Sequence, residues 1–289
     1  MNVSNQFLDM NQYSYSVIVP YRDKYDLFVK AIESIPDRDD IQIIIVDNAP
    51  QPIKEDMVPV KRDATIVYAN SSPVKGAGCA RNEGLRHVEG RYILFLDADD
   101  FFTVEAFDAF DKYIGSEYDI VYFRADSVSL VYGSRSERHK NIDYLVKTYD
   151  KTGNEDFLRY RFINPVAKML RSEFVKDNGF QFDEIPVSND VWFSVMTGHS
   201  AKLITADKSV VYMITTGESG SSLTKKLTKE NWFTRFQVCV KVNKFLKSIG
   251  KYNYRIRLLG GLRVAWRKFG FREFMRFLKY AFESHVGIF

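Results

Sequence analysis

The chain has 289 residues, 45% of them hydrophobic and 27% charged, with a net charge of +4 and two cysteines, Cys79 and Cys239. A chain of this length can bury a full core, so a disulfide framework and a structural zinc site are excluded, and the two cysteines favour a reduced, intracellular setting. The polar first 13 residues lack the apolar region of a signal peptide, and the longest apolar runs are far shorter than the ~20 residues of a spanning helix.

Strand and helix signals alternate along the first half of the chain. Short apolar runs predict strands over residues 16–19, 41–46, 65–69 and 92–96. Helical spacing of apolar residues predicts helices over residues 26–35, 80–87 and 104–114. Continuous apolar strands separated by helices indicate an α/β domain with a mostly parallel central sheet covered on both faces.

The second half is less regular. It predicts strands over 128–132, 166–170 and 210–214, helices over 172–178 and 190–197, and a Gly/Ser loop over 215–222. From residue 228 onward the pattern is helical, with breaks near Gly250 and Gly270. We therefore expect an α/β domain over residues 1–222, a boundary near Leu223, and a basic, aromatic-rich helical extension over residues 223–289.

Candidate binding residues follow the predicted strands. In open α/β sheets, ligands bind beyond the carboxyl ends of the strands. Pro20 and Tyr21 follow the first strand, and Asp47 follows the second. The Asp47 carboxylate can accept a hydrogen bond from a nucleotide base or a ribose, but the same residue also suits an Asx turn. Both interpretations remain open from the sequence.

A glycine-rich segment, residues 76–84, leads into the helix predicted over residues 80–87. Its glycines let the backbone approach a ligand, the helix N-terminus favours anions, and Arg81 adds forked donors for phosphate or carboxylate. The pattern is G-x-G-x-x-R after the third strand, which differs from a dinucleotide-binding fingerprint, and a P-loop pattern is absent. A dehydrogenase or P-loop enzyme is therefore disfavoured.

Three carboxylates, those of Asp97, Asp99 and Asp100, follow the strand over residues 92–96. Like charges this close repel each other unless a cation or hydrogen bonds compensate. Mg²⁺ and Mn²⁺ prefer oxygen ligands, commonly one or two carboxylates plus substrate phosphates. The sequence therefore predicts metal or nucleotide binding at Asp97 and Asp99. An acidic cap for the helix near residue 104, a role that suits Asp100, is the other interpretation.

The segments 16–21, 43–48, 78–85 and 92–100, in this order, resemble the family-2 inverting glycosyltransferases. That family has the GT-A fold, a Rossmann-like fold that binds nucleotide sugars, and includes enzymes of bacterial O-antigen, capsule and exopolysaccharide synthesis. The likeness is weaker from residue 164 to about residue 222, and it does not extend to the helical extension. One departure is Asn48-Ala49-Pro50, where the family often has Asp-Gly-Ser.

The resemblance implies roles for the donor-binding residues. Pro20, Tyr21 and Asp47 would line the base and ribose, and Arg81 would help to hold the nucleotide. Asp97-Ala98-Asp99 would be the D-x-D motif that binds the donor with Mn²⁺ or Mg²⁺. Within it, Asp99 would be the direct metal ligand, and Asp97 would lie nearer the ribose and the metal.

The resemblance also assigns a general base. The family's base is the Asp of a Glu-Asp pair that opens a later helix, and here Asn189-Asp190 occupies that place. Asp190 also suits a helix N-cap, and as an ordinary Asp it needs positioning more than a shifted pKa. Lys168 either faces the donor or acceptor phosphates, as in the family, or is a solvated surface lysine. The segment 217–222 resembles a loop that closes over the donor, and a flexible linker explains it too.

These assignments predict an inverting transferase that moves a sugar from a nucleotide donor, a UDP-sugar, to a hydroxyl of a lipid-linked saccharide. The alternative from another class is a non-catalytic nucleotide- or glycan-binding partner protein, for which Asn189 in place of Glu is the hint. A nucleotidyltransferase is disfavoured, because the basic Gly-rich loop that such enzymes carry after the first strand is absent.

The C-terminal segment is strongly basic. Residues 241–289 contain twelve Lys/Arg and two acidic residues, a local net charge of +10, which leaves −6 for the rest of the chain. An apolar stripe recurs at helical spacing: Phe274, Phe277, Leu278, Ala281 and Phe282. Such a helix can lie on an anionic membrane surface or pack on the α/β body. We expect a cytoplasmic enzyme at the inner face of the membrane, and no nucleic-acid partner, because no nucleic-acid motif is present.

Overall fold

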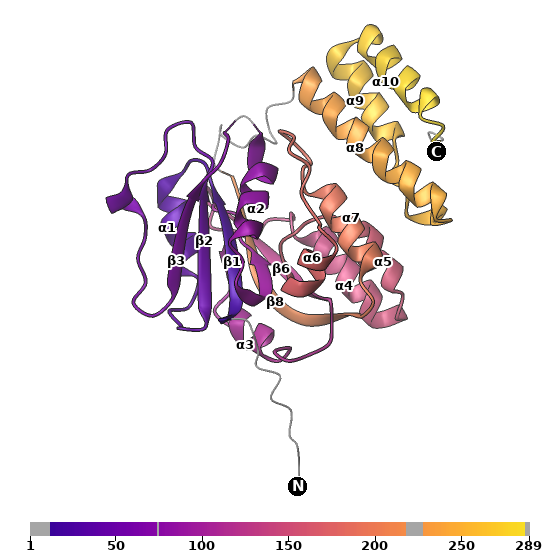
Figure 1. Cartoon of the computed structure of the whole chain (residues 1–289). Helices are drawn as coiled ribbons and strands as arrows, with labels where there is room; N and C mark the ends of the chain where they lie inside the picture. The colour runs from indigo at the N-terminus through magenta and orange to yellow at the C-terminus, as the bar shows by residue number, and fades with distance from the viewer. Residues whose placement is uncertain (1–11, 74, 218–227, 287–289) are drawn as a thin grey trace.

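The computed structural model describes residues 12–286 apart from residue 74 and residues 218–227 (Figure 1). Its centre is an eight-stranded sheet with the order β3-β2-β1-β4-β7-β6-β8-β5. The strands are β1 (Tyr13–Tyr21), β2 (Ile41–Asp47), β3 (Thr65–Asn70), β4 (Gly90–Phe95), β5 (Phe101–Phe102), β6 (Ile120–Ser129), β7 (Lys168–Arg171) and β8 (Ile204–Thr216). The predicted α/β fold is confirmed. Its sheet, predicted to be mostly parallel, is mixed, because β7 and β5 run antiparallel to their neighbours.

The helices of the body are α1 (Tyr25–Glu33), α2 (Gly76–Arg86), α3 (Ala106–Asp111), α4 (Lys140–Thr152), α5 (Glu155–Arg161), α6 (Ser172–Asp177) and α7 (Val191–Ser200). A short 3₁₀ helix covers Glu55–Met57. All seven residues of β2 are buried, as expected for a strand with helices on both faces. Edge-to-face contacts between aromatic rings, such as Phe102 with Phe107, fill the space between α3 and the sheet.

The structure corrects the sequence in the middle of the chain. The strand predicted over 128–132 is wrong, since β6 ends at Ser129. The next three residues, Leu130, Val131 and Tyr132, are exposed in a turn. Gly133, with a φ of 59°, allows that turn. Helices α4 and α5 were not predicted, although Ile142, Leu145 and Val146 give α4 a buried face.

The C-terminal extension folds as three helices, α8 (Lys229–Ser248), α9 (Leu259–Phe269) and α10 (Phe271–Glu283), with a 3₁₀ turn at Tyr252–Tyr254. They form a lobe beside the body, with α8 nearest to α7 (Figure 1). Phe236 on α8 packs with Leu262 and Phe277 in a core of the lobe's own. Val238 and Val242, also on α8, pack against Val195 of α7. The predicted boundary at Leu223 and residues 218–222 of the predicted loop lie outside the described residues.

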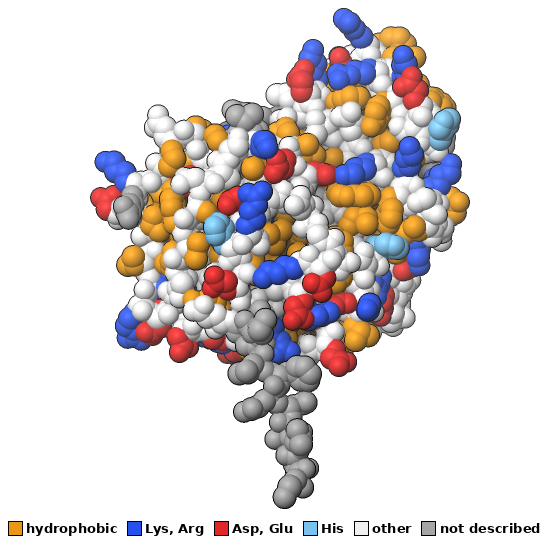
Figure 2. Space-filling model, in the orientation of Figure 1, with side chains coloured by type: hydrophobic (Ala, Val, Ile, Leu, Met, Phe, Trp, Pro, Cys, Tyr) orange, Lys and Arg blue, Asp and Glu red, His pale blue; other side chains and the backbone are white. Residues whose placement is uncertain are grey.

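The predicted apolar stripe on the last helix is divided between core and surface. Phe277 and Ala281 are buried, and Phe274 and Leu278 pack partly against them, while Phe282 is exposed. Basic and hydrophobic side chains are interspersed over this lobe (Figure 2). In the part of the chain that the structure describes, every helix is too short or too polar to cross a membrane.

Candidate active site

Arg81 connects two segments that are far apart in the sequence. Its guanidinium is buried, and its Nη2 donates to Oδ1 of Asp97 at 2.6 Å while its Nη1 donates to Oδ1 of Asn189 at 3.0 Å. Asp97 follows β4, and Asn189 lies directly before α7. Arg81 therefore holds the predicted D-x-D motif next to the segment of the predicted base. Asn189 in place of the usual Glu serves here as the neutral acceptor for Arg81.

The two other carboxylates after β4 differ in accessibility. Asp99 has a half-exposed side chain, and its Oδ2 lies 3.3 Å from Nζ of Lys24. Asp100 is buried and accepts a hydrogen bond from the backbone N–H of Thr215 at 2.7 Å. Asp100 thus anchors the end of β8, and the expected cap is wrong, because α3 begins at Ala106 without a side-chain capping bond. Lys24 and Thr215 were not foreseen, since nothing in their local sequence indicates a tertiary contact.

The side chains of Asp97 and Asp99 suit a divalent cation that is completed by a ligand's phosphates. They are 37% and 46% exposed, so a donor can reach both. Burial and the neighbouring Asp97 raise the pKa of Asp99. A bound cation would relieve this crowding of like charges. Among the described residues, no group of three or more His, Cys, Asp or Glu gathers to form a self-sufficient metal site. Two carboxylates plus a diphosphate remain a sufficient set for Mg²⁺ or Mn²⁺.

Asp190 opens α7, and its side chain makes no capping hydrogen bond. The carboxylate is therefore not committed to the helix end. Burial raises the pKa of Asp190, and Asp97 raises it further, whereas Arg81 and Lys168 act in the opposite direction. The expectation that Asp190 keeps an ordinary pKa is corrected, because the site is drier than the sequence indicated.

Lys168 is buried at the start of β7, with 2% of its surface exposed, so its interpretation as a solvated surface lysine is wrong. Its Nζ donates to the carbonyl of Phe162 at 2.8 Å and lies 4.7 Å from the centroid of the Phe162 ring. Burial lowers the pKa of Lys168 to about 7, and the charge of Asp190 opposes this shift. Lys168 is thus a buried amine within the electrostatic reach of the predicted base.

Strained backbone occurs next to these residues. Lys24, Ala167 and Ser188 have φ values of 63°, 55° and 56°, which non-glycine residues seldom adopt. Lys24 contacts Asp99, Ala167 precedes Lys168, and Ser188 precedes Asn189. Such strain persists where the surrounding structure fixes the chain, and it is concentrated at functional sites.

The residues predicted to line the base and ribose lie at the ends of β1 and β2. The Asp47 carboxylate accepts hydrogen bonds from the backbone N–H groups of Ala49 and Ile53, both at 2.8 Å, and from the Tyr68 hydroxyl at 2.7 Å. The turn interpretation of Asp47 therefore describes its local contacts. The Tyr21 ring is buried against Phe28, and Pro20 before it is partly exposed.

The glycines of α2 approach the chain's own backbone. A Cβ on Gly78 would lie 2.2 Å from the carbonyl oxygen of Asp183, so this position has room only for hydrogen. Asn82, one turn further along α2, exchanges hydrogen bonds with the backbone of Phe182 at 2.8 and 3.0 Å. Residues 182–190 are therefore seated on α2, which positions Asn189 and Asp190. The sequence indicated a ligand at these glycines, and the close approach to residue 183 was not foreseen.

We expect Gly78→Ala to lower the free energy of unfolding by about 2 kcal/mol, because the added methyl group forces residues 182–190 away from α2. Gly260→Ala is the matched control, since a Cβ there meets nothing within 4 Å and alanine favours the helix by up to about 1 kcal/mol. Urea unfolding of both variants measures the difference. Equal stability of Gly78→Ala and the unchanged protein would contradict the tight seating of this segment.

Comparisons with known proteins identify the family of the body. Residues 16–179 match the family described as Glycosyl transferase family 2. Over 121 residues the chain is 37% identical to the minor teichoic acid biosynthesis protein GgaB of Bacillus subtilis (strain 168), covering 38% of this chain and 13% of GgaB. Over 90 residues it is 33% identical to the UDP-Glc:alpha-D-GlcNAc-diphosphoundecaprenol beta-1,3-glucosyltransferase WfaP of Escherichia coli, covering 30% of this chain and 36% of WfaP. The alignments thus span less than half of either relative.

Solved structures show the same fold. Staphylococcus aureus TarS 1-349 in complex with UDP-GlcNAc superposes with a TM-score of 0.65 and 18% identity, covering 95% of this chain and 82% of that one. The mannosyltransferase PcManGT from Pyrobaculum calidifontis, in complex with GDP-Man and Mn²⁺, gives a TM-score of 0.58 at 15% identity, covering 94% and 80%. Because the family match covers more than half of the chain, the protein belongs to glycosyl transferase family 2 and is a glycosyltransferase of the GT-A type.

Proposed function

We propose that the enzyme transfers a sugar, with inversion, from a UDP-sugar to a hydroxyl of a lipid-linked saccharide in the synthesis of a bacterial surface polysaccharide. The observation that carries the proposal is the Arg81 bridge, in which one guanidinium bonds both Asp97 and Asn189, the residue before Asp190. The names of two relatives support the setting: GgaB is a teichoic acid biosynthesis protein, and WfaP uses UDP-Glc and a lipid diphosphate acceptor.

Asp190 is the proposed general base. It takes the proton of the acceptor hydroxyl as that oxygen attacks the anomeric carbon from the face opposite to the leaving nucleoside diphosphate. The new carbon–oxygen bond forms as the bond to the diphosphate oxygen breaks, and the configuration inverts. Burial, which raises the pKa of Asp190, makes this carboxylate a stronger base than one in water.

The donor side uses Asp97 and Asp99. A Mn²⁺ or Mg²⁺ ion held by them would supply positive charge to the departing diphosphate. Arg81 keeps Asp97 in place, and Lys168 offers a buried amine near Asp190, toward the donor or acceptor phosphates. Ala98, between the two carboxylates, is buried and fixes the turn that presents them. Pro20, Tyr21 and Asp47 form the proposed base and ribose end of the donor site.

The extension is the proposed contact with an anionic membrane surface at the cytoplasmic face. Trp266, Phe271 and Phe282 are more than half exposed on α9 and α10, among the basic residues of these helices. Aromatic side chains can enter the lipid headgroup region while each Lys or Arg near the surface contributes about 1 kcal/mol. This placement would bring a lipid-linked acceptor to the enzyme.

Thermal unfolding with nucleotides tests the donor assignment. We expect UDP to raise the unfolding temperature only when Mn²⁺ or Mg²⁺ is present, because a ligand at 100 times its dissociation constant adds about 2.7 kcal/mol of stability. Asp99→Asn should remove the cation-dependent part of the shift, whereas Asp108→Asn on α3 should keep it. A shift without any sugar transfer would favour the non-catalytic binding protein. No shift with UDP, GDP or their sugars would overturn the donor site.

A further inference from the structure

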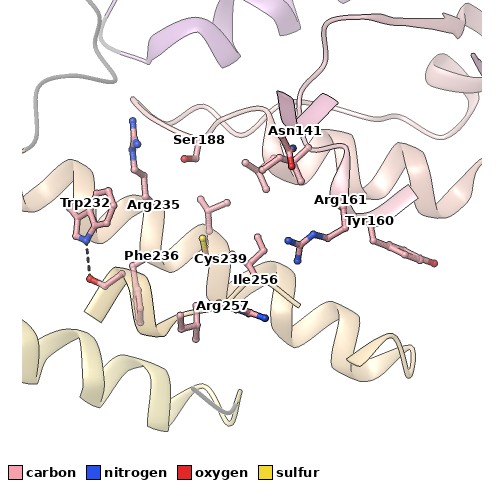
Figure 3. A pocket seen from close by; sticks show the side chains of 15 residues that line it. Asn141, Tyr160, Arg161, Ser188, Trp232, Arg235, Phe236, Cys239, Ile256 and Arg257 are labelled. Atoms are coloured by element: carbon pink, nitrogen blue, oxygen red, sulfur yellow. Dashed lines mark hydrogen bonds between the residues drawn. The ribbon is translucent and has the colours of Figure 1, made fainter. Parts of the chain in front are cut away.

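A pocket of about 440 Å³ lies between the body and the extension (Figure 3). Ser188 and Val191, which flank Asn189-Asp190 in the sequence, line it from the body. Trp232 and Phe236 of α8 line the facing wall. Its volume is in the range of small-molecule sites. The pocket is therefore large enough for part of a substrate, and it is lined by residues one or two positions away from Asp190 in the sequence.

One wall of the pocket is apolar and held in place. Phe236 is 3% exposed, and the Nε1 of Trp232 donates to the carbonyl of Gly261 at 3.0 Å, which fixes the indole ring. Ile256 and Leu258 extend the same surface. Trp232 and Ile256 are the partly exposed members of this wall, and covering them with an apolar chain is favourable in proportion to the area removed from water.

The pocket is also basic. Arg161, Arg235 and Arg257 line it, and none of the described lining residues is acidic. Arg161 donates to the carbonyl of Arg255 at 3.0 Å and extends toward Ile256 in Figure 3, while the Arg235 guanidinium lies 5.9 Å from the Trp232 ring. Guanidinium groups suit phosphate oxygens, with which they form forked, charge-assisted hydrogen bonds. Arg161 and Arg257 therefore bring two positive charges to a lining whose described residues include no acid, and this favours an anionic ligand.

We propose that this pocket binds the carrier part of the acceptor, a phosphate or diphosphate ester on an apolar chain. The phosphate would lie on the arginines and the start of the chain on the wall formed by Trp232 and Phe236. A sugar attached to that phosphate would then reach Asp190 past Ser188. The inference rests on the proposed function, and a saccharide without a carrier would use neither the charge nor the apolar wall.

Titration calorimetry with farnesyl diphosphate tests the pocket without any donor, in EDTA, so that no cation draws the diphosphate to Asp97 and Asp99. We expect farnesyl diphosphate to bind at least tenfold more tightly than pyrophosphate or farnesol. Arg257→Gln should weaken binding at least tenfold, and Cys239→Phe, which fills the pocket, should do the same. The control Arg263→Gln removes an equal charge from exposed α9 outside the pocket and should keep the affinity within twofold.

Two results would overturn the proposal. Equal binding of pyrophosphate and farnesyl diphosphate would show that the apolar wall takes no part. Equal weakening by Arg263→Gln and Arg257→Gln would show that the ligand is attracted to the overall positive charge of the extension and not to this pocket. Anionic phosphatidylglycerol vesicles are expected to behave in that way and to lose affinity equally for both variants. The UDP-dependent unfolding shift is measured on the same samples. If the UDP-dependent shift is absent and farnesyl diphosphate still binds, the proposed transferase function is wrong. If the shift is present and farnesyl diphosphate does not bind, only the pocket proposal is wrong.

Discussion

Asp190→Asn is expected to reduce the turnover number about 10²- to 10⁴-fold, the range that general base catalysis contributes. An amide cannot accept the proton of the acceptor hydroxyl, while its size and shape preserve the start of α7. Because the Asp190 side chain makes no capping bond and burial raises its pKa, the neutral amide should not lower the unfolding temperature. Initial rates of sugar transfer at saturating donor and acceptor, with unfolding curves of the same samples, measure both effects.

The matched control is Asp183→Asn, in the segment that leads to Asp190. The Asp183 carboxylate pairs with Nζ of Lys241 at 2.9 Å, and its backbone N–H, which the variant keeps, donates to the carbonyl of Asn189 at 3.1 Å. This variant should keep its turnover number within about twofold. Unchanged transfer by Asp190→Asn would remove Asp190 as the base, and a product with retained anomeric configuration, seen by NMR, would contradict single displacement.

Lys168→Met is expected to make the protein more stable and less active. At pH 6 the buried amine is protonated in both the folded and the unfolded states, so the folded state bears the full cost of desolvating a charge. Methionine removes that cost, and we expect a gain on the order of 2 kcal/mol in the free energy of unfolding. Transfer should fall at least tenfold at the same time, because the amine near Asp190 is lost.

The pH dependence of this gain identifies its cause. Between the folded pKa of Lys168, about 7, and its unfolded value of 10.5, the unfolded chain binds the extra proton. The stability contribution of Lys168 therefore rises with pH across this window, and the advantage of Lys168→Met should shrink from pH 7 toward pH 10. Urea unfolding at pH 6, 8 and 10 measures this trend.

Lys176→Met serves as the control. Lys176 is exposed, and its Nζ also donates to a backbone carbonyl, that of Val88 at 2.7 Å. Its replacement should change stability little and equally at each pH. A loss of stability in Lys168→Met that is constant from pH 6 to pH 10 would mean that Lys168 stays protonated in the folded protein.

The sequence predicted features that depend on local pattern. The apolar run over residues 43–46 in β2 and the acidic turn after β4 could be placed because one strand or one turn carries each signal. Helix α4 could have been found from the spacing of Ile142, Leu145 and Val146, but its polar ends hid that period. Local pattern was therefore sufficient for strands β1 to β4 and less so for the irregular middle of the chain.

Contacts between distant segments could not be predicted. The bond from Arg81 to Asn189 joins residues 108 positions apart, and the collision site of a Cβ at Gly78 lies on Asp183. The burial of Lys168 depends on Phe162 and Tyr122, which come from different elements. In each case the residue type was informative, but only the tertiary fold determines whether an arginine, glycine or lysine meets a ligand or the chain itself.

Helix α8 has a consequence for how the protein behaves as a whole. One side of it completes the core of the extension through Phe236, and another side covers Val195 of α7 through Val238 and Val242. The extension is thus not a detachable module, because cutting the chain before α8 would uncover the helix that carries Asp190. We therefore expect the body and the extension to unfold together, so that a substitution deep inside the extension also weakens the packing of α7.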